Sequence, residues 1–142
     1  MSTPLKTCLV MCDFHAIRSP LTHLVLQKQF PNLNIISAGI SPSPREEGYV
    51  QLAKNHGFDF DMAPQRNFRD LDSNTIDLAI SYSAKGYQIL LEQKRYNPKL
   101  KIVFWALSVP DFMIKGDKNT TFNAFLDEIH QLANNHLDFL TK

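Results

Sequence analysis

Near the N-terminus, one short segment carries a thiol, a guanidinium and a hydroxyl in an order suited to nucleophilic chemistry on an anion. Five residues separate Cys12 from Arg18, and Ser19 follows at once. A thiolate is a strong nucleophile, an arginine presents a planar fork of donors to two oxygens of a tetrahedral anion, and a hydroxyl can stabilise sulfur as it leaves. A cysteine beside arginine at a helix N-terminus is commonly ionised at neutral pH. The segment therefore predicts a nucleophile, an anion clamp and a leaving-group stabiliser.

The residues between the thiol and the guanidinium predict an anion-binding loop. They must bend between a strand and a helix, so their backbone N–H groups can converge on a point that the positive end of the helix dipole also faces. Such a loop binds a phosphate- or sulfate-type oxyanion. The loop residues expected to contact the anion are Asp13, Phe14, His15, Ala16 and Ile17.

The same residues also have a purely structural interpretation. A cysteine and an arginine at this spacing occur by chance in many proteins, and a cysteine at the end of a strand is often only a small apolar core residue. The position of Cys12 and Arg18 between a predicted strand and a predicted helix favours the functional interpretation, since the ligand sites of open parallel sheets lie where a strand turns into its helix.

The elements that would position this loop are a β-rich run before it and a helical pattern after it. Residues 7–11 are predominantly apolar and suit a strand that is buried on both faces and ends at Cys12. Ser19 and Pro20 predict a hydroxyl N-cap and a first-turn proline for a helix that ends near Phe30.

The rest of the chain repeats this alternation of strand and helix. Further strands are expected at residues 34–37, 78–81 and 101–105, and further helices at residues 44–56, 85–93 and 119–140. Gly57 is expected in the C′ position of the second helix, and residues 41–44 and 58–72 are expected to be loops. The last helix is amphipathic and should pack on the sheet. The pattern predicts an α/β fold of three layers, a four-stranded parallel sheet with helices on both faces.

The composition favours one cytoplasmic domain spanning residues 1–142. A chain of this length with 44% apolar residues can bury a sufficient core without disulfides. Its two cysteines, Cys8 and Cys12, would lie too far apart on one strand to bond, which favours reduced thiols. A net charge of +1 gives no basic surface for nucleic acid or an anionic membrane, and the apolar stretch from Cys8 to Cys12 is too short for a signal or spanning segment.

No metal or cofactor is expected. The five histidines do not form, with cysteine and carboxylate residues, the close cluster that zinc needs. We expect the chain to be a monomer or a weak dimer.

The chain resembles a low-molecular-weight protein tyrosine phosphatase, a fold shared with thioredoxin-coupled arsenate reductases. The resemblance extends from about Lys6 to Leu140. It rests on five segments in this order, namely Cys12–Pro20, Ser37–Gly39, His56–Asp59, Asp77–Ser81 and Val109–Asp111. It implies the phosphotyrosine protein phosphatase I-like fold.

The resemblance also implies a role for individual residues. Cys12 would form a phosphocysteine, Arg18 would clamp the phosphate, and Asp111 would protonate the leaving tyrosyl oxygen and then act as base on water. Phe112 or Met113 could form an apolar wall for the substrate ring, although core packing is the usual role of either residue. The implied partner is a phosphotyrosine protein or a small aryl phosphate.

The anion loop departs from the family pattern at three positions. Phe14 and His15 stand where the family usually has a small residue, often glycine, and an asparagine. A phenylalanine is strained in backbone angles that glycine adopts freely, although a protonated His15 would favour the thiolate. Asp13 places a carboxylate beside a site for a dianion, which weakens binding unless its side chain points outward.

Two further departures lie outside the loop. Phe112 follows Asp111 where the family commonly has a proline, and this loosens the loop of the general acid. Tyr82 and Ser83 occupy the place after the third strand where the family usually has an acidic residue.

Three functions therefore stay open. The first is a phosphatase that works through Cys12. The second is a catalytically weak or inactive member that binds a phosphorylated ligand or protein. The third is an arsenate reductase-like enzyme, which would need an external partner thiol, because the only other cysteine, Cys8, lies inside the first strand.

Overall fold

The computed structural model describes residues 6–12, 18–40, 47–64, 66–105 and 118–135. In chain order, the strands and α-helices are β1 (Thr7–Cys12), α1 (Arg18–Gln29), β2 (Asn34–Gly39), α2 (Glu47–Asn55), β3 (Leu78–Ser81), α3 (Ala84–Lys94), β4 (Lys101–Phe104) and α4 (Lys118–Asn135). Between α2 and β3 the described chain forms the short 3-10 helices η1 (Phe60–Met62), η2 (Phe68–Asp70) and η3 (Ser73–Thr75).

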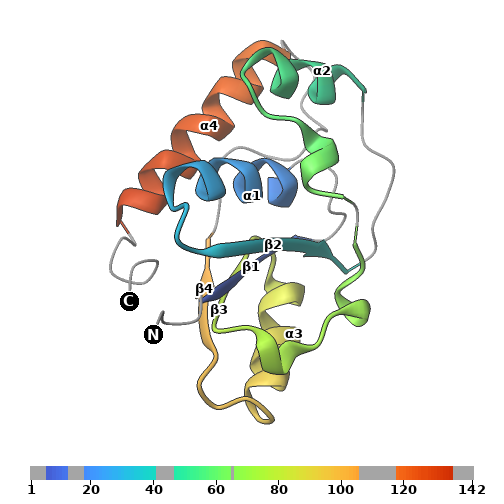
Figure 1. The fold of residues 1–142 in the computed structure, drawn as a ribbon, viewed down its shortest axis with the longest axis vertical. Helices are drawn as coiled ribbons and strands as arrows, with labels where there is room; N and C mark the ends of the chain where they lie inside the picture. Colours follow the sequence, from blue (N-terminus) through green and yellow to red (C-terminus); the bar gives the residue numbers. More distant parts are fainter. Residues whose placement is uncertain (1–5, 13–17, 41–46, 65, 106–117, 136–142) are drawn as a thin grey trace.

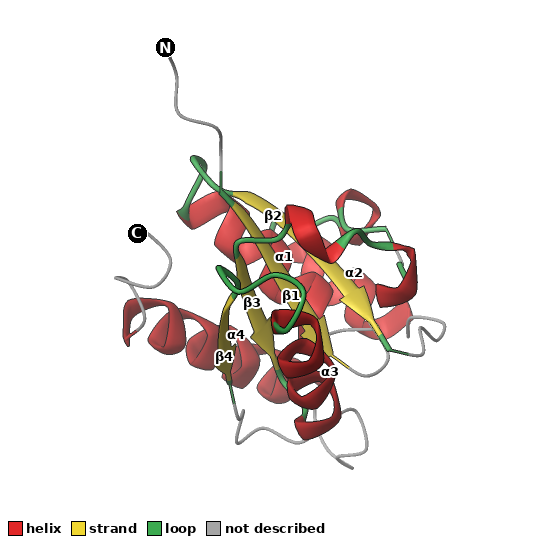
Figure 2. Ribbon diagram, turned by 90° about the horizontal axis from the view of Figure 1, so that it is seen from below, coloured by secondary structure: helices red, strands yellow, loops and turns green. Residues whose placement is uncertain are grey.

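The described strands form one parallel sheet in the order β2-β1-β3-β4 (Figure 2). β1 is central: Met11 pairs with Ala38 of β2 on one side and with Ser81 of β3 on the other. The chain leaves β1 toward β2 and later returns to the opposite side of β1 as β3. The crevice for a ligand in such a sheet lies at the carboxyl ends of the two strands where the direction reverses, here β1 and β3.

Helices cover both faces of the sheet, as predicted. Figure 1 shows α1, α2 and α4 on one side and α3 on the other. β1 is buried against both layers because its side chains alternate between the two faces. Cys8, Val10 and Cys12 belong to the cluster on the α1 side, whereas Leu9 and Met11 pack with the α3 side. The α/β prediction is confirmed.

The last helix packs differently from the prediction. Its fully buried Phe122, Phe125 and Ile129 lie among residues of α1, α2 and η1 rather than on the sheet. Only the end of the described helix, with Ala133 and the half-buried Leu132, joins the cluster that contains β1. α4 therefore packs against α1 and α2 along most of its length.

The predicted strand bounds are close to those of the structure. β3 has the predicted bounds, β1 includes Cys12, and β4 stops one residue earlier, at Phe104. β2 continues to Gly39, two residues beyond its prediction, because Cys12 and Gly39 still pair in the ladder.

The helix bounds show one error of substance. Ser19 is not an N-cap, because α1 already begins at Arg18 and Ser19 lies inside its first turn. α3 is one residue longer at each end and has Ser83 as its N-cap, whose hydroxyl accepts from the N–H of Gly86. α2 ends at Asn55, and the predicted residues 44–46 and 136–140 of α2 and α4 lie outside the described part.

The predicted helix stop at Gly57 is confirmed. Gly57 has φ +86°, a left-handed conformation in which a side chain is strained. The N–H of Phe58 donates to the carbonyl of Ala53, and that of Gly57 to the carbonyl of Lys54, so the last carbonyls of α2 are satisfied.

Candidate active site

The thiol of Cys12 lies at the centre of the carboxyl edge of the sheet. Cys12 is the last residue of β1 and is 2% exposed. Its carbonyl accepts from the N–H of Ile40 at 3.2 Å, and the carbonyl of Met11 accepts from the N–H of Tyr82 at 3.0 Å. Cys12 is therefore fixed between the ends of β2 and β3, at the position where an open parallel sheet binds ligands.

A serine of α1 contacts this thiol directly. The Oγ of Ser19 lies 2.9 Å from the Sγ of Cys12, and Ser19 is fully buried. A hydroxyl at this distance can donate to a thiolate, and water does not compete for it here. The pair that the sequence predicted is thus brought together, although Ser19 holds its place from inside the first helical turn.

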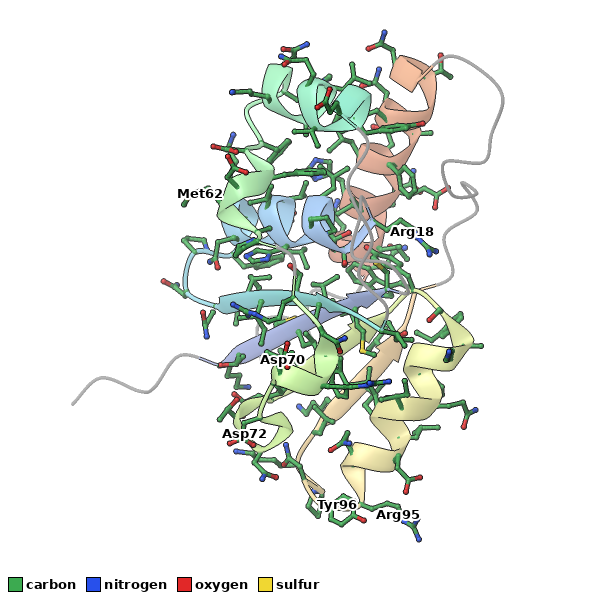
Figure 3. The ribbon with its side chains drawn as sticks, turned by 90° about the vertical axis from the view of Figure 1, so that its right-hand side faces the viewer. Arg18, Met62, Asp70, Asp72, Arg95 and Tyr96 are labelled. Carbon is green, nitrogen blue, oxygen red and sulfur yellow. The ribbon has the colours of Figure 1, made fainter. Side chains whose placement is uncertain are left out.

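Arg18 begins the same helix beside this pair. Its backbone carbonyl accepts from the hydroxyl of Thr22 at 2.8 Å. Figure 3 shows the labelled Arg18 side chain just beyond the carboxyl ends of the strands. The N-terminal turn of α1 therefore presents a guanidinium, a hydroxyl and the positive end of a helix dipole at the edge where the thiol lies.

Several predicted site residues lie outside the part of the chain that the structure describes. These are Asp13, Phe14, His15, Ala16 and Ile17 of the anion loop, together with Asp111 and Phe112. Their roles stay predictions.

A buried polar pair behind the thiol was not predicted. The hydroxyl of Tyr82, the residue after β3, makes a short hydrogen bond with the Oγ1 of Thr22 in α1. Tyr82 is 5% exposed and belongs to the same core cluster as Cys12. Burial raises the pKa of Tyr82 above the ordinary value of a phenol, so its hydroxyl stays protonated. The one sequence signal for this pair was that Thr22 follows Arg18 by one helical turn.

A second polar contact joins α1 to β2. The Nδ1 of the half-buried His23 lies 2.7 Å from the Oγ of Ser37. Ser37 is buried and pairs in the ladder with Val10, two residues before Cys12 on β1. Polar residues thus connect α1 to both strands that flank β1.

The second cysteine is a core residue. Cys8 is fully buried on the same face of β1 as Cys12, and neither forms a disulfide. Burial raises the pKa of the Cys8 thiol to about 12. Cys8 is therefore a neutral thiol at physiological pH and has no access to a substrate.

One cavity of the described structure lies away from the nucleophile. It has a volume of about 500 Å³ and is lined by the end of β2, η2 and α3, with Arg69 and Lys85 at its walls. Cys12, Arg18 and Ser19 are not among its lining residues.

Within the residues that the structure places, we found no group of three or more histidine, cysteine or carboxylate side chains that could hold a metal ion. Among the same residues, no helix is long and apolar enough to cross a membrane.

Comparison with known sequences points to one family. The family model described as "Low molecular weight phosphotyrosine protein phosphatase" matches residues 7–142. A curated relative of Ralstonia solanacearum, "Probable low molecular weight protein-tyrosine-phosphatase EpsP", is 28% identical over 128 residues, which are 88% of this chain and 87% of the relative.

Solved structures show the same fold at lower identity. YfkJ from Bacillus subtilis superposes with a TM-score of 0.73 at 18% identity, over 97% of this chain and 98% of YfkJ. An arsenate reductase in the phosphate binding state superposes with a TM-score of 0.68 at 15% identity, over 92% of this chain and 98% of the reductase.

Proposed function

Because the chain belongs to the low molecular weight phosphotyrosine protein phosphatase family, we propose that it is a cysteine-dependent phosphomonoester hydrolase acting on phosphotyrosine proteins or small aryl phosphates. The observation that carries this proposal is the contact of 2.9 Å between the thiol of Cys12 and the hydroxyl of Ser19, beside Arg18 in the first turn of α1. A purely structural cysteine would gain nothing from a helix N-terminus, a guanidinium and a buried hydroxyl at one point.

The first chemical step forms the phosphoenzyme. Arg18 holds two phosphoryl oxygens with its planar fork, and the loop residues 13–17 offer backbone N–H groups to the same anion. The sulfur of Cys12 attacks phosphorus while the bond from phosphorus to the aryl oxygen breaks. Asp111 donates its proton to that oxygen, so the product leaves as a neutral phenol. Phe112 packs against the aromatic ring.

The second step returns the free enzyme. Water attacks the phosphorus of the phosphocysteine, Asp111 accepts a proton from the water, and the bond from phosphorus to sulfur breaks. The electron pair stays on the sulfur of Cys12 as a thiolate. The hydroxyl of Ser19, which lies 2.9 Å away, donates a hydrogen bond to that thiolate and stabilises it as a leaving group.

The test is hydrolysis of aryl phosphate and phosphotyrosine peptide by wild type, Cys12→Ser and Cys8→Ala. We expect Cys12→Ser to lose all measurable turnover and Cys8→Ala to keep it, since Cys8 is buried in the core. Trapping a phosphorylated Cys12 by rapid acid quench would identify the intermediate. Unchanged activity in Cys12→Ser would refute the mechanism.

A second candidate is a phosphate-binding protein without catalysis. Asp13, Phe14 and His15, which depart from the family pattern, favour it. This candidate predicts that wild type binds inorganic phosphate in calorimetry but hydrolyses no aryl phosphate. The calorimetric titration and the hydrolysis assay together distinguish the two functions.

The likeness to an arsenate reductase shows a shared fold, and arsenate reduction is the third candidate. In this chain, reduction would consume an external thiol, because the only other cysteine is the buried Cys8. Arsenate-dependent consumption of glutathione by the purified protein tests it. We also propose a cytoplasmic location, because neither cysteine is used for a disulfide.

A further inference from the structure

The contact between Tyr82 and Thr22 joins the end of β3 to the first turns of α1, and the proposed reaction needs these two elements in a fixed relative position. Tyr82 follows β3, and Thr22 lies one turn into α1, 60 residues away in sequence. The backbone N–H of Tyr82 donates to the carbonyl of Met11, the residue before Cys12. Tyr82 is therefore attached to the end of β1 through its backbone and to the start of α1 through its side chain.

The donor and acceptor groups fix the direction of the two hydrogen bonds that link Tyr82, Thr22 and Arg18. The carbonyl of Arg18 can only accept, so the single hydroxyl hydrogen of Thr22 points toward it over 2.8 Å. The oxygen of Thr22 must then accept from Tyr82, whose hydroxyl is the donor. The order is Tyr82 to Thr22 to the backbone of Arg18. A threonine that bonds back to a carbonyl one turn earlier is common, but here a buried phenol also fixes its rotamer.

The side chains of Tyr82 and Thr22 are tightly enclosed by their neighbours. Thr22 is fully buried and Tyr82 is 5% exposed, so no water shell competes for either hydroxyl. The tyrosine ring lies 6.1 Å from the ring of Trp105, whose backbone N–H donates to the carbonyl of Ser81 at the end of β3. The Tyr82 side chain is therefore held by the ring of Trp105 and by the hydroxyl of Thr22.

From this arrangement we propose that Tyr82 and Thr22 are a pair of positioning residues that hold the first turn of α1 over the end of β1. The pair sets where Arg18 and Ser19 stand relative to the sulfur of Cys12. In this proposal both residues act through Arg18 and Ser19 rather than on the substrate. The inference rests on the proposed function, since it assigns Arg18 and Ser19 to a phosphate site.

The test uses substitutions that remove one hydroxyl and keep the shape of the side chain. Tyr82→Phe keeps the ring, and Thr22→Val keeps the volume of threonine. Tyr87→Phe is the matched control, because Tyr87 lies half-buried on α3 with its ring edge-on to Phe104. Thermal unfolding of every variant reports the structural effect separately.

We expect each single variant to lower kcat/KM for an aryl phosphate about tenfold, since small displacements of a clamp lose much of its contribution. The inhibition constant of inorganic phosphate should rise by a similar factor. The kcat/KM of the double variant should be no lower than that of the poorer single variant, because both substitutions break the same series of hydrogen bonds. Tyr87→Phe should leave kcat/KM and the inhibition constant of phosphate unchanged.

A purely structural role gives a different result. The proposal is overturned if Tyr82→Phe and Thr22→Val lower the unfolding temperature but keep the wild-type kcat/KM and phosphate inhibition. It is also overturned if their effects add fully in the double variant.

A separate measurement keeps this proposal distinct from the proposed function. Protection of Cys12 against iodoacetamide by inorganic phosphate needs anion binding but no turnover, and Cys12→Ser supplies the background. If wild type hydrolyses nothing, the proposed function fails, while weaker protection in Tyr82→Phe than in wild type still supports the positioning pair. Equal protection in the two proteins overturns it.

Discussion

Replacement of Ser19 by alanine tests the contact on which the second chemical step depends. Ser19→Ala removes the hydroxyl that lies 2.9 Å from the Cys12 sulfur. In the proposed mechanism, negative charge returns to that sulfur when the phosphocysteine breaks down. Without the donor, the thiolate is a poorer leaving group, so hydrolysis of the phosphoenzyme should slow.

The size of the effect follows from the burial of the two residues. Cys12 is 2% exposed and Ser19 is fully buried, so water cannot replace the missing hydroxyl. A hydrogen bond to a charged partner contributes about 1.5–3 kcal/mol under such conditions. If the bond is fully developed only in the transition state, kcat should fall about 10- to 150-fold.

The assay is rapid-mixing hydrolysis of an aryl phosphate at several pH values. We expect a burst of phenol release, followed by a slower steady state than in wild type, since formation of the phosphoenzyme is affected less than its breakdown. Ser81→Ala is a matched control. Ser81 is equally buried at the neighbouring strand end, but its hydroxyl donates to the carbonyl of Ser83 on the other side of the sheet.

A folded Ser19→Ala protein with wild-type kcat and no burst would refute this reasoning. An equal fall of kcat in Ser81→Ala would also refute it, because the effect would then not be specific to the contact between Ser19 and Cys12.

Other predictions concern Asp111, Gly57, Phe125 and Cys8. Asp111→Asn should lower kcat more for phosphotyrosine than for p-nitrophenyl phosphate, because a poor leaving group needs the proton; the ratio of the two rates checks this. Gly57→Ala should lower the free energy of unfolding by about 1 kcal/mol because its φ of +86° strains a side chain, as urea titration would show. Phe125→Ala should cost about 3–5 kcal/mol in the same titration, since Phe125 is fully buried between α4 and its neighbours, whereas the exposed Tyr96→Ala should cost little. Burial raises the pKa of the Cys8 thiol from 9.0 to about 12, so on raising the pH the unfolded chain loses this proton before the folded protein does. The free energy of unfolding should therefore fall as pH rises from about 9 toward 12. The urea midpoint of Cys8→Ala should depend less on pH in this range.

The strands could be predicted from the sequence because their signal is local. The apolar run before Cys12 and the β-rich residues 78–81 gave bounds within one residue of β1 and β3. The packing of α4 against α1 and α2 could not be predicted in this way. An amphipathic pattern shows that one face of a helix is buried, but the same apolar stripe fits a sheet or two other helices equally well.

The candidate site was predictable in part for a similar reason. Cys12, Arg18 and Ser19 lie close in sequence, so their spacing carried the information. The predicted contact of Ser19 with the sulfur of Cys12 is present, and only the predicted N-cap role of Ser19 is wrong, because α1 begins one residue earlier, at Arg18. Tyr82 was noted only for the acidic residue that it replaces, because its contact with Thr22 requires β3 to lie beside β1, and the sequence does not state the order of strands.

The position of Cys8 has a consequence for the survival of the protein under peroxide. A nucleophilic thiol that meets an oxidant becomes a sulfenic acid, which a nearby cysteine can capture as a reversible disulfide. The chain has only two cysteines, and Cys8 stands four residues before Cys12 on one extended strand, about 13 Å away at the usual rise per residue. If Cys12 is the nucleophile that we propose, its oxidised form depends on thiols from outside the molecule for repair, and continued oxidation inactivates the site permanently.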